Sequence, residues 1–155
     1  MNNNSKLLLE HLEKRIDRED DRDKNFETKA NYIIALSIVL YGMVVKDINI
    51  KIFENESANK IMWLIIVSGL AYSIYCSLKV LNNREYKYIN VDDITGNHLE
   101  MTESKFCEHM AIQLIKNIQS NKETTDNKAK WYHKGITSLL VILMIITISI
   151  IVEVI

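Results

Sequence analysis

The 155-residue chain contains no proline, four glycines and two cysteines, and its net charge is only −1. Without proline, and with little glycine, the sequence favours long uninterrupted helices over a turn-rich β-fold. Cys76 and Cys107 are too few for a disulfide framework and fall in different segments. The small net charge leaves no basic footprint of the kind that binds nucleic acid, so we expect no direct nucleic-acid partner.

Charge is missing altogether from three windows, Ala30–Val45, Ile61–Leu78 and Gly135–Val152, which are 16, 18 and 18 residues long. A soluble helical protein would place charges at three- to four-residue spacing along every helix. A bilayer core of about 30 Å needs about 20 helical residues. The windows therefore predict an all-α membrane protein with three transmembrane helices. The competing interpretation, that these helices are buried in a soluble core, leaves too little amphipathic chain to cover them.

The windows and their flanks predict the organisation of the chain. The first apolar run follows a charged stretch and has no small-residue cleavage site, which argues against a signal peptide. In chain order we predict an N-terminal cytoplasmic amphipathic helix (1–29), a first span (30–46), a short outer loop (47–60), a second span (61–79), a cytoplasmic connector with a helix (80–134) and a third span (135–155). The predicted membrane boundaries are marked by Lys29, Lys46, Lys60, Lys79 and Lys134.

Basic residues predict the orientation of the spans. Lys and Arg number seven in the segment up to Lys29 and nine in the connection 79–134, against three in the connection 46–60. Positive residues concentrate on the cytoplasmic side. We therefore expect a multi-pass protein of the bacterial inner membrane, with a cytoplasmic N-terminus and the C-terminus outside.

Two cytoplasmic segments have the pattern of amphipathic helices. The N-terminal segment carries a stripe of Leu8, Leu9, Leu12 and Ile16 and continues without a break into the first span. In the connector, Thr102 is expected to cap a helix over 103–119. Its apolar face holds Phe106, Met110, Leu114 and Ile118, with Ala111 and Ile115 beside them. We expect these faces to pair in a juxtamembrane bundle, within one chain or between subunits.

Two local interruptions are also expected in the connector. Tyr86, Ile89 and Val91 suggest a short extended piece, and the polar run Asn121–Asn127 is expected to separate the connector helix from the last one, which would start at Thr125 or Asp126.

The sequence offers little catalytic chemistry. Cys107 and His109 are two residues apart, so they point to different faces of a helix and do not grip one metal ion together, and His98 and His133 are distant. Asp92 and Asp93 have the pattern of a surface turn. We find none of the phosphate-binding, dinucleotide or nucleophile motifs. We therefore expect a protein that is not an enzyme and uses no metal or cofactor.

Small residues mark one face of the second span. Gly69, Ser73 and Ser77 recur every four residues, a spacing that lets membrane helices approach closely. The stripe could pack the bundle within one chain or join subunits of a homo-oligomer, and the sequence leaves both open. The three charge-free windows contain no Asp, Glu, His or Arg, which argues against a dedicated pump or transporter.

The order of these parts resembles a known class. A charged helix leads through Asp21–Lys29 into Ala30, and a later helix carries Glu108, Ala111, Gln113 and Leu114, then Asn121 and Lys128-Ala129 ahead of the last span. Over residues 14–150 this resembles SLATT proteins and the Pycsar membrane effectors of bacterial antiphage defence. In that comparison Lys29-Ala30 and Lys128-Ala129 set membrane boundaries.

The resemblance implies an abortive-infection effector. A sensor or a partner that makes a nucleotide signal would detect phage, and the effector would oligomerise in the lipid bilayer and disrupt the inner membrane. Residues 82–134 depart from this pattern because they contain no recognisable cyclic-nucleotide-binding module. The alternatives from the residues alone are a passive membrane anchor that recruits a cytoplasmic partner, and a subunit of a larger channel.

Overall fold

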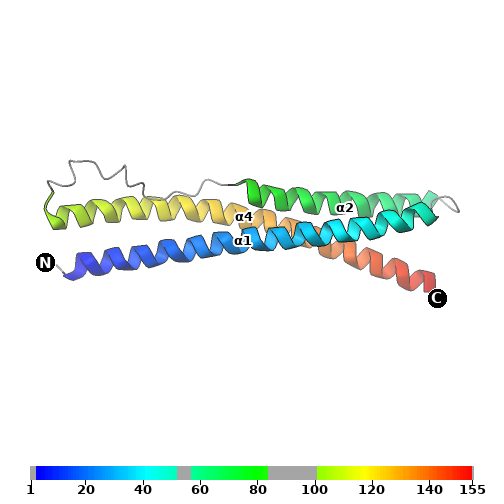
Figure 1. The fold of residues 1–155 in the computed structure, drawn as a ribbon, viewed down its shortest axis with the longest axis horizontal. Coiled ribbons are helices and arrows are strands. Elements are labelled where there is room, and N and C mark those ends of the chain that lie inside the picture. Colours follow the sequence, from blue (N-terminus) through cyan, green and yellow to red (C-terminus); the bar gives the residue numbers. More distant parts are fainter. Residues whose placement is uncertain (1–2, 52–56, 84–100, 155) are drawn as a thin grey trace. The chain divides into compact units, whose positions relative to one another are not determined.

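The computed structural model describes residues 3–51, 57–83 and 101–154, and these form three helices (Figure 1). The helices are α1 (Asn3–Lys51), α2 (Ser57–Asn82) and α4 (Glu103–Val154). No strand occurs in those ranges, so the predicted all-α fold class is confirmed. The extended piece expected at 86–91 and the acidic pair at 92–93 lie outside the described residues.

The structure corrects the predicted break in the connector. Helix α4 runs through Asn121–Asn127 without interruption, and its 52 residues include both the connector helix and the third apolar window. Its start agrees with the prediction, because the backbone N–H of Phe106 donates a hydrogen bond to the carbonyl of Thr102 at 3.0 Å. The predicted outer loop is shorter than expected, since α1 extends to Lys51 and α2 begins at Ser57.

The break was expected because the run is polar, but its positions continue the buried stripe of the helix. In α4 the stripe follows alternating steps of three and four residues, and every member is buried or half-buried. Its members are Ala111, Leu114, Ile118, Asn121, Thr125, Lys128, Tyr132, Gly135, Leu139, Ile142, Ile146 and Ser149. Helix α1 has the same spacing at Leu9, Leu12, Ile16, Glu19, Asp23, Phe26, Ala30, Ile33, Ser37, Leu40 and Val44. This seven-residue repeat is typical of helices that pack lengthwise in coiled coils.

The chain divides into two compact units. One combines residues 1–25 with 84–127, and we call it the two-helix unit after the parts of α1 and α4 that it contains. The other combines 26–83 with 128–155 and contains α2 with the remaining parts of α1 and α4; we call it the three-helix unit.

In the two-helix unit, α1 and α4 run side by side in the same direction (Figure 1). Leu12 is buried against Ala111, Leu114 and Ile118. Further along both helices, Arg22 contacts Asp126. Residue numbers rise together on the two helices, so the pairing is parallel.

In the three-helix unit, α2 runs opposite to α4. Ser73, Gly69 and Met62 of α2 contact Gly135, Ser138 and Ser149 of α4 respectively, so the numbers fall on one helix as they rise on the other. The apolar core of the unit is formed by Ile33, Val44, Ile66, Leu70, Leu139 and Ile142.

All three helices are long and apolar enough to cross a membrane. In their most apolar 18-residue windows, only 22%, 28% and 17% of the residues are buried. Many of the remaining apolar side chains face outward, including Leu64, Val39 and Met144, which are 71%, 53% and 61% exposed. A surface of this kind is suited to lipid and is costly in water.

Candidate functional site: contacts between α1 and α4

Polar side chains replace apolar ones at successive buried positions of the two-helix unit. On α1, Asp23 is 6% exposed, and on α4, Asn121 and Thr125 are fully buried. The Thr125 hydroxyl has no hydrogen-bond partner among the described residues. A buried hydroxyl in that state costs about 1–3 kcal/mol. The contact between α1 and α4 is therefore apolar around Leu12 and becomes polar towards Asp23 and Thr125. The polar part contributes less to the pairing of the two helices than the apolar part.

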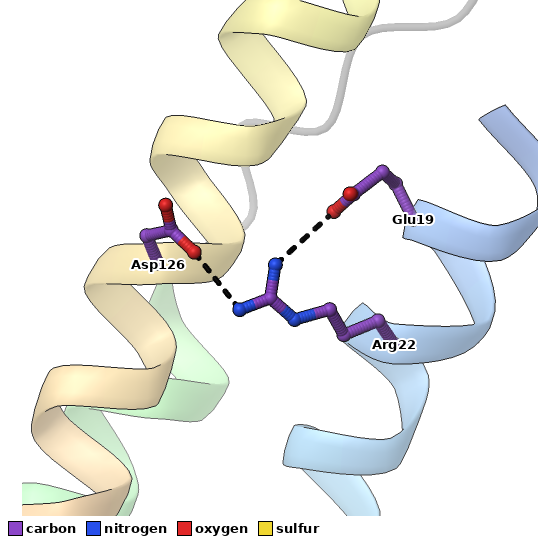
Figure 2. A network of polar contacts seen from close by, with 3 residues as sticks. All are labelled: Glu19, Arg22 and Asp126. Carbon is purple, nitrogen blue, oxygen red and sulfur yellow. Dashed lines mark hydrogen bonds and ion pairs between the residues drawn. The ribbon is translucent and has the colours of Figure 1, made fainter. Parts of the chain in front are cut away.

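An arginine joins the two helices beside these positions (Figure 2). The guanidinium of Arg22 lies 3.5 Å from the carboxylate of Glu19 on the same helix and 2.9 Å from that of Asp126 on α4. Arg22 and Asp126 are each 42% exposed. Water and salt screen a pair with that exposure, so it contributes about 0.2–1 kcal/mol.

The three-helix unit contains a second ion pair between α1 and α4, and this one is buried. The ammonium of Lys128 donates a hydrogen bond to Glu27 Oε1 at 2.7 Å. The Lys128 side chain is 1% exposed, whereas that of Glu27 is 38% exposed. Burying an ammonium is strongly unfavourable unless a carboxylate and further hydrogen bonds compensate it. Glu27, 101 residues earlier in the chain, supplies one such carboxylate.

This burial changes the role expected for Lys128. The resemblance to membrane effectors implied that Lys128-Ala129 marks a membrane boundary, but a boundary lysine extends its ammonium to the interface. Lys128 instead turns inward to Glu27, while Lys29 is exposed as expected. The sequence contained one signal for this: Lys128 continues the seven-residue stripe of α4.

The predicted cytoplasmic apolar face lies largely in the contact between the helices. Leu114 and Ile118 are buried with Ala111, and Phe106 and Met110 are half-buried. Ile115 is 49% exposed and lies off the face. On α1 the corresponding stripe is Leu9, Leu12 and Ile16, whereas Leu8 is 51% exposed.

The predicted small-residue stripe packs against α4 of the same chain. Ser73 donates a hydrogen bond to the Gly135 carbonyl at 3.0 Å, and Ser138 donates one to the Gly69 carbonyl at the same distance. Ser77 is buried and donates to the carbonyl of Ser73. A Cβ atom added to Gly69 would lie 2.7 Å from Ile142 Cγ1. A larger residue at position 69 would therefore require the side chain of Ile142 to move.

Three predicted boundary lysines lie at one end of the three-helix unit with three aromatic residues. The ammonium of Lys29 lies 6.0 Å from the ring centroid of Tyr132, and that of Lys134 lies 4.4 Å from that of Trp131. The ammonium of Lys79 lies 5.7 Å from that of Tyr75. We call this set the aromatic–lysine cluster: Lys29, Lys79, Lys134, Tyr75, Trp131 and Tyr132. Lys46 is exposed near the other end of α1, and Lys60 belongs to α2.

The described residues bring few reactive groups together. Among the described residues, no three His, Cys, Asp or Glu side chains gather as they would around a metal ion. Cys76 and Cys107 are both free thiols, and Cys76 is buried. His109 lies 3.2 Å from the amide nitrogen of Gln113, one turn along the same helix. The contacts that distinguish this protein are those that pair its helices.

Comparison of the chain with protein-family models, with curated proteins and with solved structures found no match.

Proposed function

We propose that this chain is a membrane effector of a bacterial antiphage system, which oligomerises and disrupts the inner membrane when a partner protein or a nucleotide signal triggers it. It is not an enzyme, and it acts by changing how its helices pair. The N-terminus and residues 80–134 lie in the cytoplasm, where the trigger binds, and the C-terminus lies outside.

The observation that carries the proposal is the way α1 and α4 are paired. Their contact in the two-helix unit combines a small apolar cluster with buried polar side chains and a half-exposed arginine bridge. Such a contact is specific in register and modest in strength. A trigger that binds the active arrangement more tightly than the resting one can shift an equilibrium of this kind.

The exposed apolar surface supports the second part of the proposal. Most residues of each apolar window are not buried within one chain, so subunits can associate through their spans as well as contact lipid. The stripe of Gly69, Ser73 and Ser77 is filled by α4 of the same chain. Contacts between subunits therefore use other faces of the spans, and a bulky residue at Gly69 would test folding and not oligomerisation.

The same filled stripe favours one alternative, a passive membrane anchor. A three-helix unit whose stripe of Gly69, Ser73 and Ser77 is filled internally can hold a cytoplasmic segment at the membrane without rearranging. The two functions differ in what happens when the pairing of α1 and α4 is weakened. An effector then becomes active without its trigger, and an anchor does not.

The test measures membrane potential with a voltage-sensitive dye in bacteria that express one of four chains. These are the wild type, the single variants Glu27→Gln and Lys14→Gln, and the double variant that combines Glu27→Gln and Lys128→Met. Glu27→Gln leaves a buried charge without its carboxylate, and the double variant removes that charge again. We expect depolarisation with Glu27→Gln and a normal potential with the other three. The wild-type chain is then expressed with its neighbouring genes and challenged with phage.

Membrane fractions and helical content of each variant establish that the chain is inserted and folded. An unchanged potential in every strain, including infected cells, would favour the anchor. Depolarisation by all variants, the wild type included, would contradict a resting state held by these contacts.

A further inference from the structure

The aromatic–lysine cluster joins all three helices at the level where their apolar windows begin or end. Lys29 directly precedes the first window, Lys79 directly follows the second and Lys134 directly precedes the third. The rings connect them: Tyr75 of α2 and Trp131 of α4 meet edge to face at a centroid distance of 6.1 Å. On the other side, Tyr132 contacts Phe26 of α1 at 5.6 Å. Three separate sequence boundaries thus meet at one level of the three-helix unit.

No carboxylate of the described residues neutralises the charges of this cluster. Lys29, Lys79 and Lys134 are all exposed, and within the described part of the chain none of them pairs with a carboxylate. The acidic residue closest in sequence to Lys29, Glu27, is already paired with Lys128. Three ammonium groups therefore face solvent directly beside an apolar surface.

We propose that the aromatic–lysine cluster binds the phosphate groups of anionic phospholipids. Lysine is a compact positive charge suited to phosphate. Tyrosine and tryptophan are favoured at headgroup depth because one part of the ring is apolar and one part is polar. Basic sites between transmembrane helices select anionic headgroups for the same reason. The inference depends on membrane insertion but not on the effector function proposed above.

Tryptophan fluorescence can test this proposal, because the chain has two tryptophans and each can be made the sole reporter. Trp63→Phe leaves Trp131, which lies in the cluster, and Trp131→Phe leaves Trp63 near the far end of α2. Each full-length variant is reconstituted in phosphatidylcholine vesicles that contain a minority of phosphatidylglycerol. In one sample the phosphatidylcholine is brominated close to its headgroup, and in a second sample the phosphatidylglycerol is. Comparing how efficiently each brominated lipid quenches the tryptophan fluorescence gives the preference for the anionic lipid around the reporter.

We expect phosphatidylglycerol to be preferred at Trp131. Each Lys→Gln change at position 29, 79 or 134 should lower that preference by up to about fivefold, since a lysine near an anionic surface contributes about 1 kcal/mol. The triple variant should show no preference, and a triple Lys→Arg variant should keep it. Lys46→Gln is the matched control outside the cluster and should leave quenching at Trp131 unchanged.

Equal quenching of Trp131 by both lipids in the wild-type background would overturn the proposal. A preference that survives the triple Lys→Gln change would also overturn it, as would a triple change that alters Trp63 as strongly as Trp131. Replacing chloride by inorganic phosphate at matched ionic strength should leave the preference intact, and its loss would show that the cluster binds free phosphate instead of lipid. Because leakage is not measured, failure here leaves the effector proposal standing.

Discussion

The buried ion pair of the three-helix unit makes an asymmetric prediction: Glu27→Gln should destabilise the folded chain more than Lys128→Met. Lys128 is 1% exposed and Glu27 is 38% exposed, with 2.7 Å between Lys128 Nζ and Glu27 Oε1. Removing the carboxylate leaves an ammonium where water cannot reach it. Removing the ammonium leaves a carboxylate that water can reach.

The exposed fractions set the magnitudes. Breaking a buried ion pair from one side costs about 3–5 kcal/mol. Because Glu27 lies at the half-exposed edge of this pair, we expect the lower end, about 3 kcal/mol, for Glu27→Gln. Methionine matches the length of lysine without its charge, so Lys128→Met should cost about 1 kcal/mol, the value of a lost hydrogen bond. The double variant should be close to the wild type, because it leaves no buried charge without its partner.

The assay is equilibrium unfolding of the full chain in detergent micelles, followed by the helical circular dichroism signal. Lys14→Gln serves as the control, since the pair of Glu10 and Lys14 spans one turn and both side chains are at least 60% exposed. The free energy of unfolding of Lys14→Gln should stay within about 0.5 kcal/mol of the wild-type value. Equal costs for Glu27→Gln and Lys128→Met would refute the reasoning, because they would mean that Lys128 is hydrated in the folded protein.

Three further predictions concern other contacts. Gly69→Ala should lower the free energy of unfolding by about 1 kcal/mol, because the added Cβ would meet the flexible end of Ile142, and Ile142→Val should restore the lost stability. Gly42→Ala is the control, because Gly42 has open space around it. An equal loss of stability in Gly42→Ala would contradict the packing argument. Asp126→Asn should lower the free energy of unfolding by less than about 1 kcal/mol, and this loss should vanish at high salt because the pair with Arg22 is half-exposed. A loss of stability that salt does not change would mean that the pair is buried. The hydrogen bond from Lys14 and its positive charge hold the pKa of Glu10 below its ordinary value. The stability that this pair contributes is therefore present at neutral pH and is lost as the pH falls through the lowered pKa. Carboxyl NMR titration should show a higher pKa for Glu10 in Lys14→Gln, and an unchanged pKa would refute Lys14 as the cause.

The sequence predicted the features that depend on local patterns. A charge-free window of 16 to 18 residues needs no knowledge of its neighbours, so the three apolar helices followed directly. The same is true of Leu114 and Ile118, whose four-residue spacing defines one helix face. The start of α4 after Thr102 was predicted for the same reason.

The features that were missed depend on partners far away in the chain. Polarity at Asn121 and Thr125 suggested a loop, whereas both occupy stripe positions that α4 buries. The burial of Lys128 requires Glu27, and nothing next to Lys128 in the sequence indicates that carboxylate. For Gly69 the spacing indicated a close helix contact, but only the position of Ile142 identified α4 of the same chain as the neighbour.

The polar residues within the α1 and α4 stripes have a physical consequence beyond their cost in stability. A stripe with a uniform seven-residue apolar repeat fits its partner equally well after one helix slides by seven residues. Apolar contacts such as Leu12 with Leu114 tolerate that slip. The contacts of Arg22 with Asp126 and of Glu27 with Lys128 do not, because each is satisfied at one register, and a slip leaves Lys128 buried without Glu27. The charges therefore select a single alignment for two long helices.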